Sequence, residues 1–437
     1  MAHHLTAAGD TERAVDQWLK AGQHAAARLT YREAIAHLER GLAVLRSVPE
    51  GPNREGKEIE VQLALGLCSY TAKGPIAALP IYIRARELAD IQGNSRQRFE
   101  ALYGVWQCTY ISGRIFAARP FSERLLRLTQ SEQDTGLRLQ AHHSGWSTSI
   151  MIGELTVARE HADAGRKLYH LENHRDHRLV YGGHDPGACA RWIGALVEWL
   201  LGYPEKALAS SAESLTLAER VAHPFTSILA LTNSSVFHLN NRQPEAVLER
   251  LETAEALGAE QRLSFIIDPE IIRGAALVGL GATEEGIVRI QQGLTETRRK
   301  GATFYLSFGL AFLADALAQR GVHAAALTAA KEGLEVAGAT GERIWDAELH
   351  RLAGIALVGL NRLEEGQTAF DEALTIARRQ QAKSYELRTA TSLARLWGEL
   401  GRRAEARKLL APIYDWFTEG LDTADLEDAR RLLDELA

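Results

Sequence analysis

The chain is 437 residues long, with 46% hydrophobic and 24% charged residues, a composition typical of folded proteins that excludes a largely disordered chain. Its 50 Lys and Arg residues are scattered among 56 Asp and Glu residues, for a net charge of −6, so the basic stripe that a nucleic-acid partner requires is not seen. The chain carries neither a secretion signal nor a run of about 18 apolar residues, so we expect a cytoplasmic protein that binds no membrane.

Apolar periodicity and turn residues predict helices that come in pairs along the whole chain. In the first half, the expected helices are 12–27 and 30–46, 57–72 and 75–92, 96–111 and 114–129, and 135–151 and 154–170. In the second half, they are 187–201 and 204–221, 225–239 and 243–257, 267–280 and 283–299, 303–319 and 322–337, 342–359 and 362–380, and 383–399 and 402–418. A last helix at 423–436 caps the array. No run alternates as a β-strand does, which indicates an all-α fold.

Turn residues between the paired helices recur at a nearly constant spacing. They are Gly113, Gly153, Gly202, Asn241, Gly281, Gly321, Asn361 and Gly401, with separations of 40, 49, 39, 40, 40, 40 and 40 residues. A fixed period of this size is the signature of a solenoid, in which each hairpin buries its apolar face against its neighbours. We therefore predict one array over residues 1–437: a right-handed α-solenoid of about ten antiparallel hairpins with a C-terminal capping helix.

Small residues recur at fixed offsets from each turn residue. Seven positions before it stand Trp106, Trp146, Ala195, Ser234, Gly274, Ala314, Gly354 and Ala394, and five positions after it stand Ala118, Ala158, Ala207, Ala246, Gly286, Ala326, Gly366 and Ala406. Small side chains at matching heights let two antiparallel helices approach closely. This arrangement resembles the tetratricopeptide repeat, although the period of 40 exceeds that family's usual 34 residues. The two tryptophans also depart from its pattern.

Two segments interrupt the period. Residues 47–57 are rich in proline, glycine and charge, and residues 171–184 contain most of the extra length in the 49-residue interval. We predict that both are loops between hairpins and that they mark sub-boundaries within the array. Because long loops of a solenoid often collect on one face, either loop is a candidate for binding.

The first of these segments contains a sequence that partly matches a phosphate-binding loop. Gly51, Gly56 and Lys57 have the required spacing, but Glu58 stands where Ser or Thr would hold magnesium. A helix precedes the segment instead of a strand, and a carboxylate would repel phosphate. We therefore favour a solvated linker and expect no bound nucleotide or other cofactor.

The second segment is rich in histidine. His170, His174 and His177 would share one helical face, with His184 further on, and imidazole is a good zinc ligand. The neighbouring Asn and Arg residues instead favour an exposed helix end, so a metal-dependent hydrolase is the least favoured function, and no metal site is predicted. The cysteines Cys68, Cys108 and Cys189 lie far apart without CxxC pairing, so no disulfide framework is expected.

The sequence just after the histidine-rich segment supplies the candidate interaction surface. Asp185 followed by Pro186 is typical of a helix start, which we favour over a ligand contact. Trp192 and Trp199, seven residues apart on one helical face, are the best candidates to line an exposed groove. The candidate surface comprises His184, Asp185, Arg191, Trp192, Glu198 and Trp199. No catalytic residues can be assigned.

Two stretches resemble a specific group of proteins. The first is His184-Asp-Pro-Gly-Ala-Cys-Ala-Arg-Trp192, running on from Trp199 to Leu208, and the second is 378–397, continued by 409–420. Both are similar to the C-terminal helical-repeat region of bacterial signalling proteins that join a class III adenylate or guanylate cyclase domain to an AAA-type ATPase. The opening residues Ala2–Gly9 resemble the helices that follow the ATPase there.

The resemblance implies a sensor or regulatory arm in bacterial signal transduction, but the catalytic residues of the cyclase and the ATPase have no counterparts here. We therefore predict a non-enzymatic scaffold that binds a protein, peptide or small effector on its concave face, with an ATPase or cyclase module as a further partner. The alternative is a part of a nucleotide cyclase or ATPase signalling enzyme whose catalytic domains lie outside this chain. In either case the chain is a C-terminal portion of such a protein or a stand-alone relative.

Overall fold

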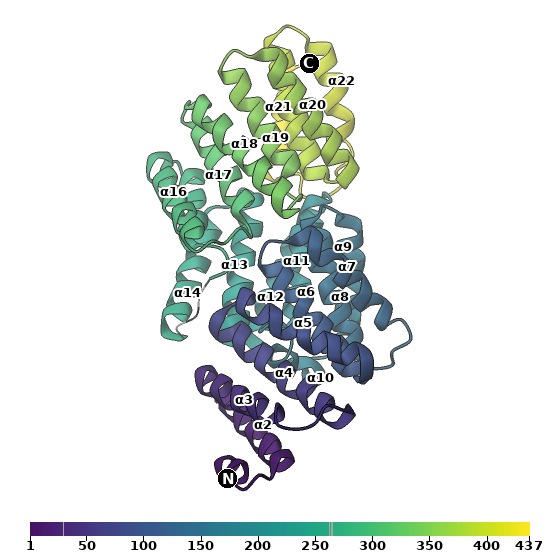
Figure 1. Ribbon diagram of the computed structural model, residues 1–437. Helices are drawn as coiled ribbons and strands as arrows, with labels where there is room; N and C mark the ends of the chain where they lie inside the picture. The colour runs from purple at the N-terminus through teal and green to yellow at the C-terminus, as the bar shows by residue number, and fades with distance from the viewer. Residues whose placement is uncertain (29, 262, 264) are drawn as a thin grey trace. The chain divides into compact units, whose positions relative to one another are not determined.

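The computed structural model describes residues 1–28, 30–261, 263 and 265–437. Within these ranges the chain forms 23 α-helices and one 3₁₀ helix, and no strand, which confirms the predicted all-α fold. Most helices pair with the next helix along the chain, as Figure 1 shows. The chain divides into two compact units: unit 1 contains Met1–Ser144 and Asp176–Gly183, and unit 2 contains Gly145–Arg175 and His184–Ala437. The expected continuity of one array over the whole chain stays a prediction.

Unit 1 contains three hairpins. Its helices are α1 (Ala2–Ala7), α2 (Thr11–Ala27), α3 (Tyr31–Leu45), α4 (Pro52–Lys73), α5 (Pro75–Gln92), α6 (Ser95–Ile111) and α7 (Ile115–Leu128), followed by most of α8 (Thr135–Met151). Helix α2 packs on α3, α4 on α5, and α6 on α7. Two details differ from prediction. Helix α1 was not expected, and α4 begins at Pro52, because proline fits the first turn of a helix. Residues 52–57 of the predicted loop 47–57 are therefore helical.

Unit 2 begins with the end of α8 and with α9 (Leu155–Leu168) and α10 (Leu171–His174). Six hairpins follow, namely α11 (Pro186–Leu200) with α12 (Pro204–Val221), α13 (Pro224–Asn240) with α14 (Glu245–Gln261), α15 (Pro269–Gly279) with α16 (Thr283–Arg299), α17 (Leu306–Gln319) with α18 (His323–Thr340), α19 (Asp346–Gly359) with α20 (Leu363–Gln380), and α21 (Lys383–Glu399) with α22 (Arg403–Tyr414). The cap is α23 (Ala424–Glu435).

Two predicted boundaries in this part of the chain were wrong. The segment predicted as the loop 171–184 contains α10 and the 3₁₀ helix Arg175–Leu179. The helix predicted over 402–418 ends at Tyr414, and the residues up to the cap form an irregular segment.

The predicted close approach of paired helices is confirmed where glycines face each other. A side chain on Gly274 would collide with the carbonyl oxygen of Gly286, and one on Gly286 would collide with that of Gly274. Where a tryptophan occupies the first small position, the partner helix compensates: Trp146 of α8 fills the space left by Gly165 of α9, and a Cβ on that glycine would overlap the indole. The two backbones therefore pack closely with either arrangement.

The turn residues end the first helices in the left-handed conformation that closes a helix C-terminus. Positive φ angles occur at the predicted turn residues Gly113, Gly153, Gly202, Gly281, Gly321, Asn361 and Gly401. The remaining turn contains Asn241 as expected, but another of its residues is left-handed. Asn241 has φ −82°, and the left-handed residue is Arg242, with φ 56°. A non-glycine residue in this conformation is costly, so a compensating contact of its side chain is expected.

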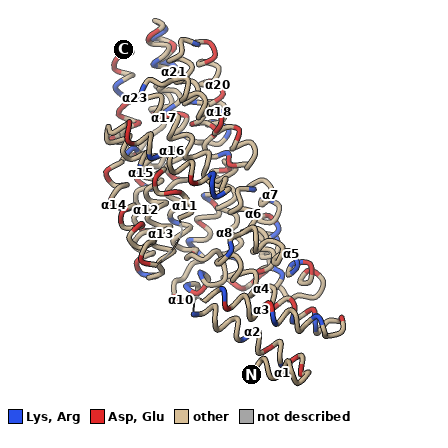
Figure 2. Tube along the Cα trace, turned by 60° about the vertical axis from the view of Figure 1, so that its left-hand side comes forward, with Lys and Arg blue, Asp and Glu red and all other residues tan. Residues whose placement is uncertain are grey.

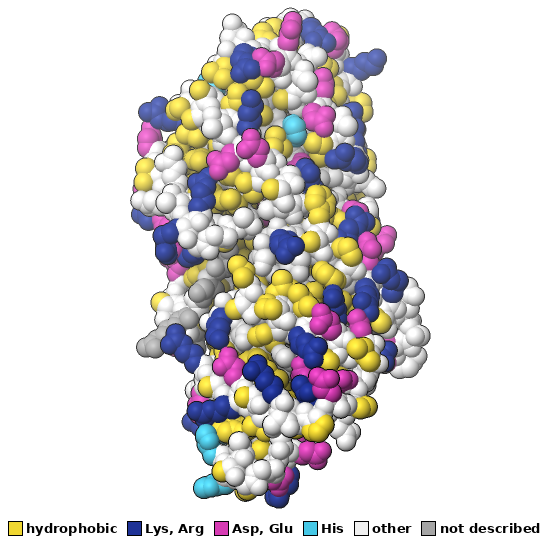
Figure 3. Space-filling view, viewed as in Figure 1, with side chains coloured by type: hydrophobic (Ala, Val, Ile, Leu, Met, Phe, Trp, Pro, Cys, Tyr) yellow, Lys and Arg dark blue, Asp and Glu magenta, His cyan; other side chains and the backbone are white. Residues whose placement is uncertain are grey.

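Charged residues of both signs are scattered along the helices, as Figure 2 shows. The face seen in Figure 3 likewise carries Lys and Arg interspersed with Asp and Glu among apolar side chains. Among the described residues, none of the helices combines the length and hydropathy needed to cross a bilayer.

Candidate functional site

The start of α11 is built by Asp185, which is completely buried. Its carboxylate accepts hydrogen bonds from the backbone N–H of Ala188 at 2.9 Å and from the hydroxyl of Tyr169 at 2.8 Å. Its own N–H donates to the Thr226 hydroxyl of α13 at 3.0 Å. The helix-start interpretation is therefore confirmed, and Asp185 ties α11 to the helices on either side of it.

The remaining candidate residues lie mostly inside unit 2. Trp192 is 5% exposed and Trp199 is 2% exposed, so the expectation that they line an exposed groove was wrong. Every residue of α11 except Arg191 is buried, so a spacing of seven residues could not show that the two rings are covered. The half-buried His184 lies with its ring 5.4 Å from that of Trp192.

The two charged candidates on α11 make specific ion pairs. Arg191 donates to the Gly187 carbonyl at 2.9 Å and pairs with Glu213 of α12 at 3.3 Å. Glu198 is buried, and Arg166 of α9 donates to it at 3.0 Å. Burial raises the pKa of Glu198, and Arg166 opposes this shift. Both residues hold α11 to its neighbouring helices within unit 2.

Trp199 is covered by α21, a helix almost 200 residues further along the chain. The ring of Tyr385 lies 5.6 Å from that of Trp199, edge to face, and the Arg388 guanidinium lies 4.9 Å from the indole centroid. The Ser384 hydroxyl donates to the Trp199 carbonyl at 2.5 Å. The two stretches that resemble the signalling proteins are therefore packed against each other inside unit 2.

A cluster of buried charges extends from this contact across three helices. Arg351 donates two hydrogen bonds to Glu348 one turn earlier on α19, and Arg388 of α21 lies 3.5 Å from the same carboxylate. Arg388 also pairs with Asp425 of α23 at 2.8 Å. Burial acts to raise the pKa of Glu348, but Arg351 and Arg388 outweigh it, so the pKa is lowered and the carboxylate stays ionised. The cluster fixes the spacing of α19, α21 and α23.

The turn between α13 and α14 docks on the same region. Arg388 donates to the Asn240 carbonyl at 2.5 Å, and Arg242 pairs with Asp428 at 2.6 Å and Asp425 at 3.3 Å. This is the contact that compensates the left-handed backbone of Arg242, because a glycine there could not reach α23.

A third turn docks in the same way. At the end of α8, the Met151 carbonyl accepts hydrogen bonds from the backbone N–H groups of Arg343 and Ile344, at 2.6 and 3.1 Å, just before α19. The ends of α8, α11 and α13 thus contact the beginnings of α19, α21 and α23 in the same order, and unit 2 folds back on itself.

The phosphate-loop-like sequence forms no cradle for phosphate. Its residues from Pro52 onward belong to α4, so most of their N–H groups are hydrogen-bonded along the helix. Lys57 pairs with Asp16 at 2.8 Å, and Glu58 pairs with Arg84 at 2.7 Å. The side chains that would contact a nucleotide therefore have other partners.

The histidine-rich segment is divided between the units. In unit 2, His174 is buried and its Nδ1 accepts the backbone N–H of His170 at 3.0 Å. In unit 1, His177 lies 3.0 Å from the Gln140 amide.

Burial raises the pKa of the cysteine thiols, to about 11 for Cys68 and about 12 for Cys108, so these cysteines stay protonated at neutral pH.

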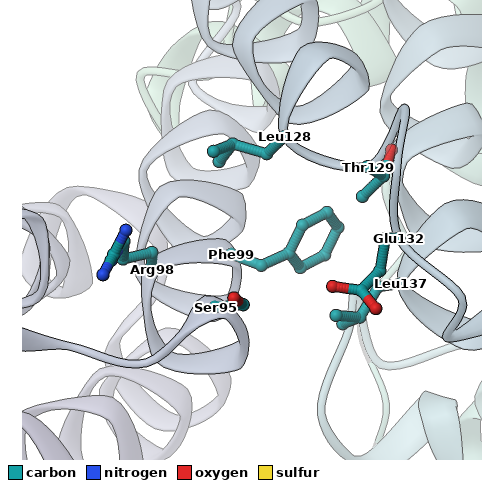
Figure 4. A pocket seen from close by; sticks show the side chains of 7 residues that line it. All are labelled: Ser95, Arg98, Phe99, Leu128, Thr129, Glu132 and Leu137. Atoms are coloured by element: carbon teal, nitrogen blue, oxygen red, sulfur yellow. The ribbon is translucent and has the colours of Figure 1, made fainter.

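Two hollows in unit 1 are small. One, of about 50 Å³, surrounds Phe99, whose ring points toward Thr129, Glu132 and Leu137 while Arg98 is directed to the other side, as Figure 4 shows. The other, of about 270 Å³, lies between α2, the end of α3 and the start of α4. Pockets for drug-sized ligands span about 300–1,000 Å³, so neither hollow would enclose such a molecule.

No family model matches the chain, and no curated protein matches its sequence. Among solved structures, a Rap protein complexed with Competence and Sporulation Factor matches with a TM-score of 0.54 and 13% identity, over 98% of this chain and 100% of the other. This likeness confirms the predicted tetratricopeptide-like helical solenoid. NprR in complex with its cognate peptide NprX has a TM-score of 0.46, with 13% identity over 70% and 83% of the two chains.

A signal-transduction ATPase (STAND) protein with a tetratricopeptide repeat sensor, from Pyrococcus horikoshii, has a TM-score of 0.43, with 15% identity over 90% of this chain and 57% of the other.

Sequence reasoning missed the residues that face the candidates across unit 2, chiefly Tyr385, Arg388 and Asp425. The signal that could have found them was the joint occurrence of two family-like stretches, one around Trp199 and one around Arg388. Their pairing depends on the curvature of five successive hairpins, which no local pattern encodes.

Proposed function

We propose that the chain is a non-enzymatic scaffold that binds a protein, peptide or small effector, as the sensor or regulatory arm of a bacterial signalling system. The observation that carries the proposal is the packing of the first helices in unit 2. Helix α11 lies on α13, α13 on α15, α15 on α17, α17 on α19 and α19 on α21, so these helices form one continuous layer. A surface built by repeated helices is suited to recognising an extended ligand.

The likeness to a Rap protein complexed with Competence and Sporulation Factor supports an effector as the ligand class. Polar side chains join successive first helices of this layer. Arg351 of α19, for example, reaches Ser392 of α21, with 3.4 Å between its Nη1 and the Ser392 hydroxyl. The junction between α19 and α21 is therefore where we would alter the surface.

The test is to select peptides from a random display library on the full chain and to measure their affinity for two variants. Ser392→Lys places a charge at the α19–α21 junction, whereas Thr368→Lys places it on the exposed side of the second helix α20. Both hydroxyls bond to a carbonyl one turn earlier, at 3.0 and 2.9 Å, so the substitutions are locally matched. We expect at least tenfold weaker binding for Ser392→Lys alone. Equal affinities for the two variants would count against a binding surface on the first helices.

The resemblance to cyclase and ATPase proteins gives the proposed arm its context, with an ATPase or cyclase module as partner. The alternative, a part of a nucleotide-dependent signalling enzyme, predicts that the isolated chain binds ATP. We expect a calorimetric titration with ATP to give no heat of binding, because the phosphate-loop-like segment is helical. A saturable heat would favour the alternative.

A further inference from the structure

The irregular segment after α22 lies against the turn between α11 and α12. The carboxylate of Glu419 accepts hydrogen bonds from the backbone N–H groups of Glu205 and Lys206, at 3.0 and 3.2 Å. In return, the N–H of Gly420 donates to the Glu205 carboxylate at 2.9 Å. The first N–H groups of a helix have no acceptor within it, and α12 makes no side-chain cap at Tyr203. A residue more than 200 positions away therefore performs the capping.

An aromatic residue accompanies this carboxylate. The Trp416 ring lies 5.8 Å from the ring of Tyr203, and the ammonium group of Lys383 lies 5.3 Å from the Trp416 centroid. Phe417 is buried. The segment thus presents an aromatic side chain and, three residues later, a carboxylate to one turn of the solenoid, as a bound peptide would.

The two surfaces are shaped for each other by a glycine on each side. A Cβ on Gly202 would lie 2.5 Å from the Trp416 ring, and a Cβ on Gly420 would overlap the ring of Pro204. The turn glycines that correspond to Gly202 in later hairpins face open space at the same position, namely Gly281, Gly321 and Gly401. Close contact at the α11–α12 turn therefore distinguishes this hairpin from these three later ones.

The Trp416 and Glu419 contacts of the docked segment are accessible at the surface. Trp416 remains 37% exposed, and the hydrogen bonds of Glu419 lie at the surface, where each contributes modestly. A competing segment with the same groups would find the same N–H donors and the same aromatic neighbour.

We propose that the α11–α12 turn is a docking site for a protein segment that carries an aromatic residue followed, three positions later, by a carboxylate. Residues 416–420 of the chain itself occupy this site until a partner segment displaces them. The inference rests on the proposed scaffold function and names the chemistry of one partner and the contact that regulates its access.

The first experiment tests the internal docking in the full chain. Amide hydrogen exchange at Glu205 and Lys206, resolved by mass spectrometry with fragmentation, is compared between Glu419→Gln and Glu427→Gln, an exposed position on α23 that removes the same charge. We expect several-fold faster exchange only in Glu419→Gln. Equal exchange in both variants would overturn the internal docking.

A second variant guards against unfolding as the cause. Gly420→Ala expels the segment through its clash with Pro204 but leaves the α11–α12 turn unaltered. Gly401→Ala is the matched control, because its φ of 78° brings similar backbone strain while its Cβ would meet no neighbour. Faster exchange at Glu205 and Lys206 is expected only in Gly420→Ala, with an unchanged helical circular dichroism spectrum.

The last experiment tests docking from outside. A fluorescent peptide with the sequence of residues 412–423 is titrated into the wild type, Gly420→Ala and Gly401→Ala, alongside a peptide in which Gln replaces the glutamate. We expect at least tenfold tighter binding of the native peptide to Gly420→Ala than to the wild type, and weaker binding of the Gln peptide. If the native peptide bound neither protein, or bound the wild type and Gly420→Ala with equal affinity, the proposed docking site would be ruled out. The proposed scaffold function would be untouched, because Ser392→Lys tests it at another junction.

Discussion

Glu342 is a buried carboxylate whose ionisation should limit stability at neutral pH. It is 1% exposed, between α18 and α19. Its carboxylate accepts hydrogen bonds from the Tyr305 N–H at 3.1 Å and the Ser307 hydroxyl at 2.5 Å. Burial raises its pKa from 4.5 to about 7, and these hydrogen bonds only partly oppose the shift. The folded protein therefore binds the proton more tightly than the unfolded chain does.

The sign and size of the effect follow from this difference. Because the folded-state pKa is raised, the contribution of Glu342 to stability is complete below pH 4.5 and is lost as the pH rises through about 7. Each pKa unit corresponds to about 1.36 kcal/mol. The shift from 4.5 to about 7 therefore lowers the free energy of unfolding by about 3 kcal/mol at pH 8 and by about 1 kcal/mol at pH 5. Glu342→Gln keeps an acceptor oxygen and removes the charge, so it should recover most of this cost.

The assay is urea unfolding of the wild type and Glu342→Gln at pH 5 and pH 8, followed by tryptophan fluorescence. We expect the variant to gain about 2 kcal/mol more at pH 8 than at pH 5. Glu335→Gln, an exposed position on α18, is the control and should show no pH-dependent gain. A gain for Glu342→Gln that is the same at both pH values, or a loss at pH 8, would refute the assignment of a raised pKa.

Substitutions at three further positions test the packing of unit 2 by thermal or urea unfolding. Asp185→Ala removes a buried helix cap and leaves the Tyr169 hydroxyl without its acceptor, so we expect the free energy of unfolding to fall by about 2 kcal/mol. Asp185→Asn should lower it by less. Equal losses for the two variants would contradict the capping role. Tyr385→Phe should be neutral or stabilising, because its buried hydroxyl has no hydrogen-bond partner among the described residues; a loss above about 1 kcal/mol would contradict this. Phe370→Ala should lower the free energy of unfolding by about 3–5 kcal/mol, because the Phe370 ring fills the space beside Gly354. A loss below about 1 kcal/mol would show that the neighbouring side chains close the cavity.

The regular part of the fold could be predicted because local sequence patterns determine it. Helix α16 was expected at 283–299 and forms at Thr283–Arg299, since turn residues and apolar periodicity bracket it on both sides. The pattern does not specify a backbone conformation that a distant contact decides. Arg242 takes the left-handed position in place of Asn241 because its side chain reaches Asp425 and Asp428.

The candidate site was predicted less well for the same physical reason. The expected exposure of Trp199 depended on its own helix, whereas Tyr385 and Arg388 cover it from a helix that lies nearby only after several hairpins have curved. The irregular segment that contains Glu419 was likewise expected to continue a helix to residue 418. Its docking on the first turn of α12 provides partners that the sequence does not reveal locally.

The contacts between the ends of α8, α11 and α13 and the beginnings of α19, α21 and α23 bear on how unit 2 folds. An open solenoid is stabilised by nearest neighbours alone, so it can nucleate anywhere and fray one repeat at a time. Here Ser384 bonds to Trp199 across 185 residues, and Glu419 bonds to Glu205 across 214. Closing such loops costs chain entropy before any contact forms, which slows folding, while the closed array loses its free C-terminal end. Unit 2 should therefore melt as a cooperative body instead of unravelling from α23.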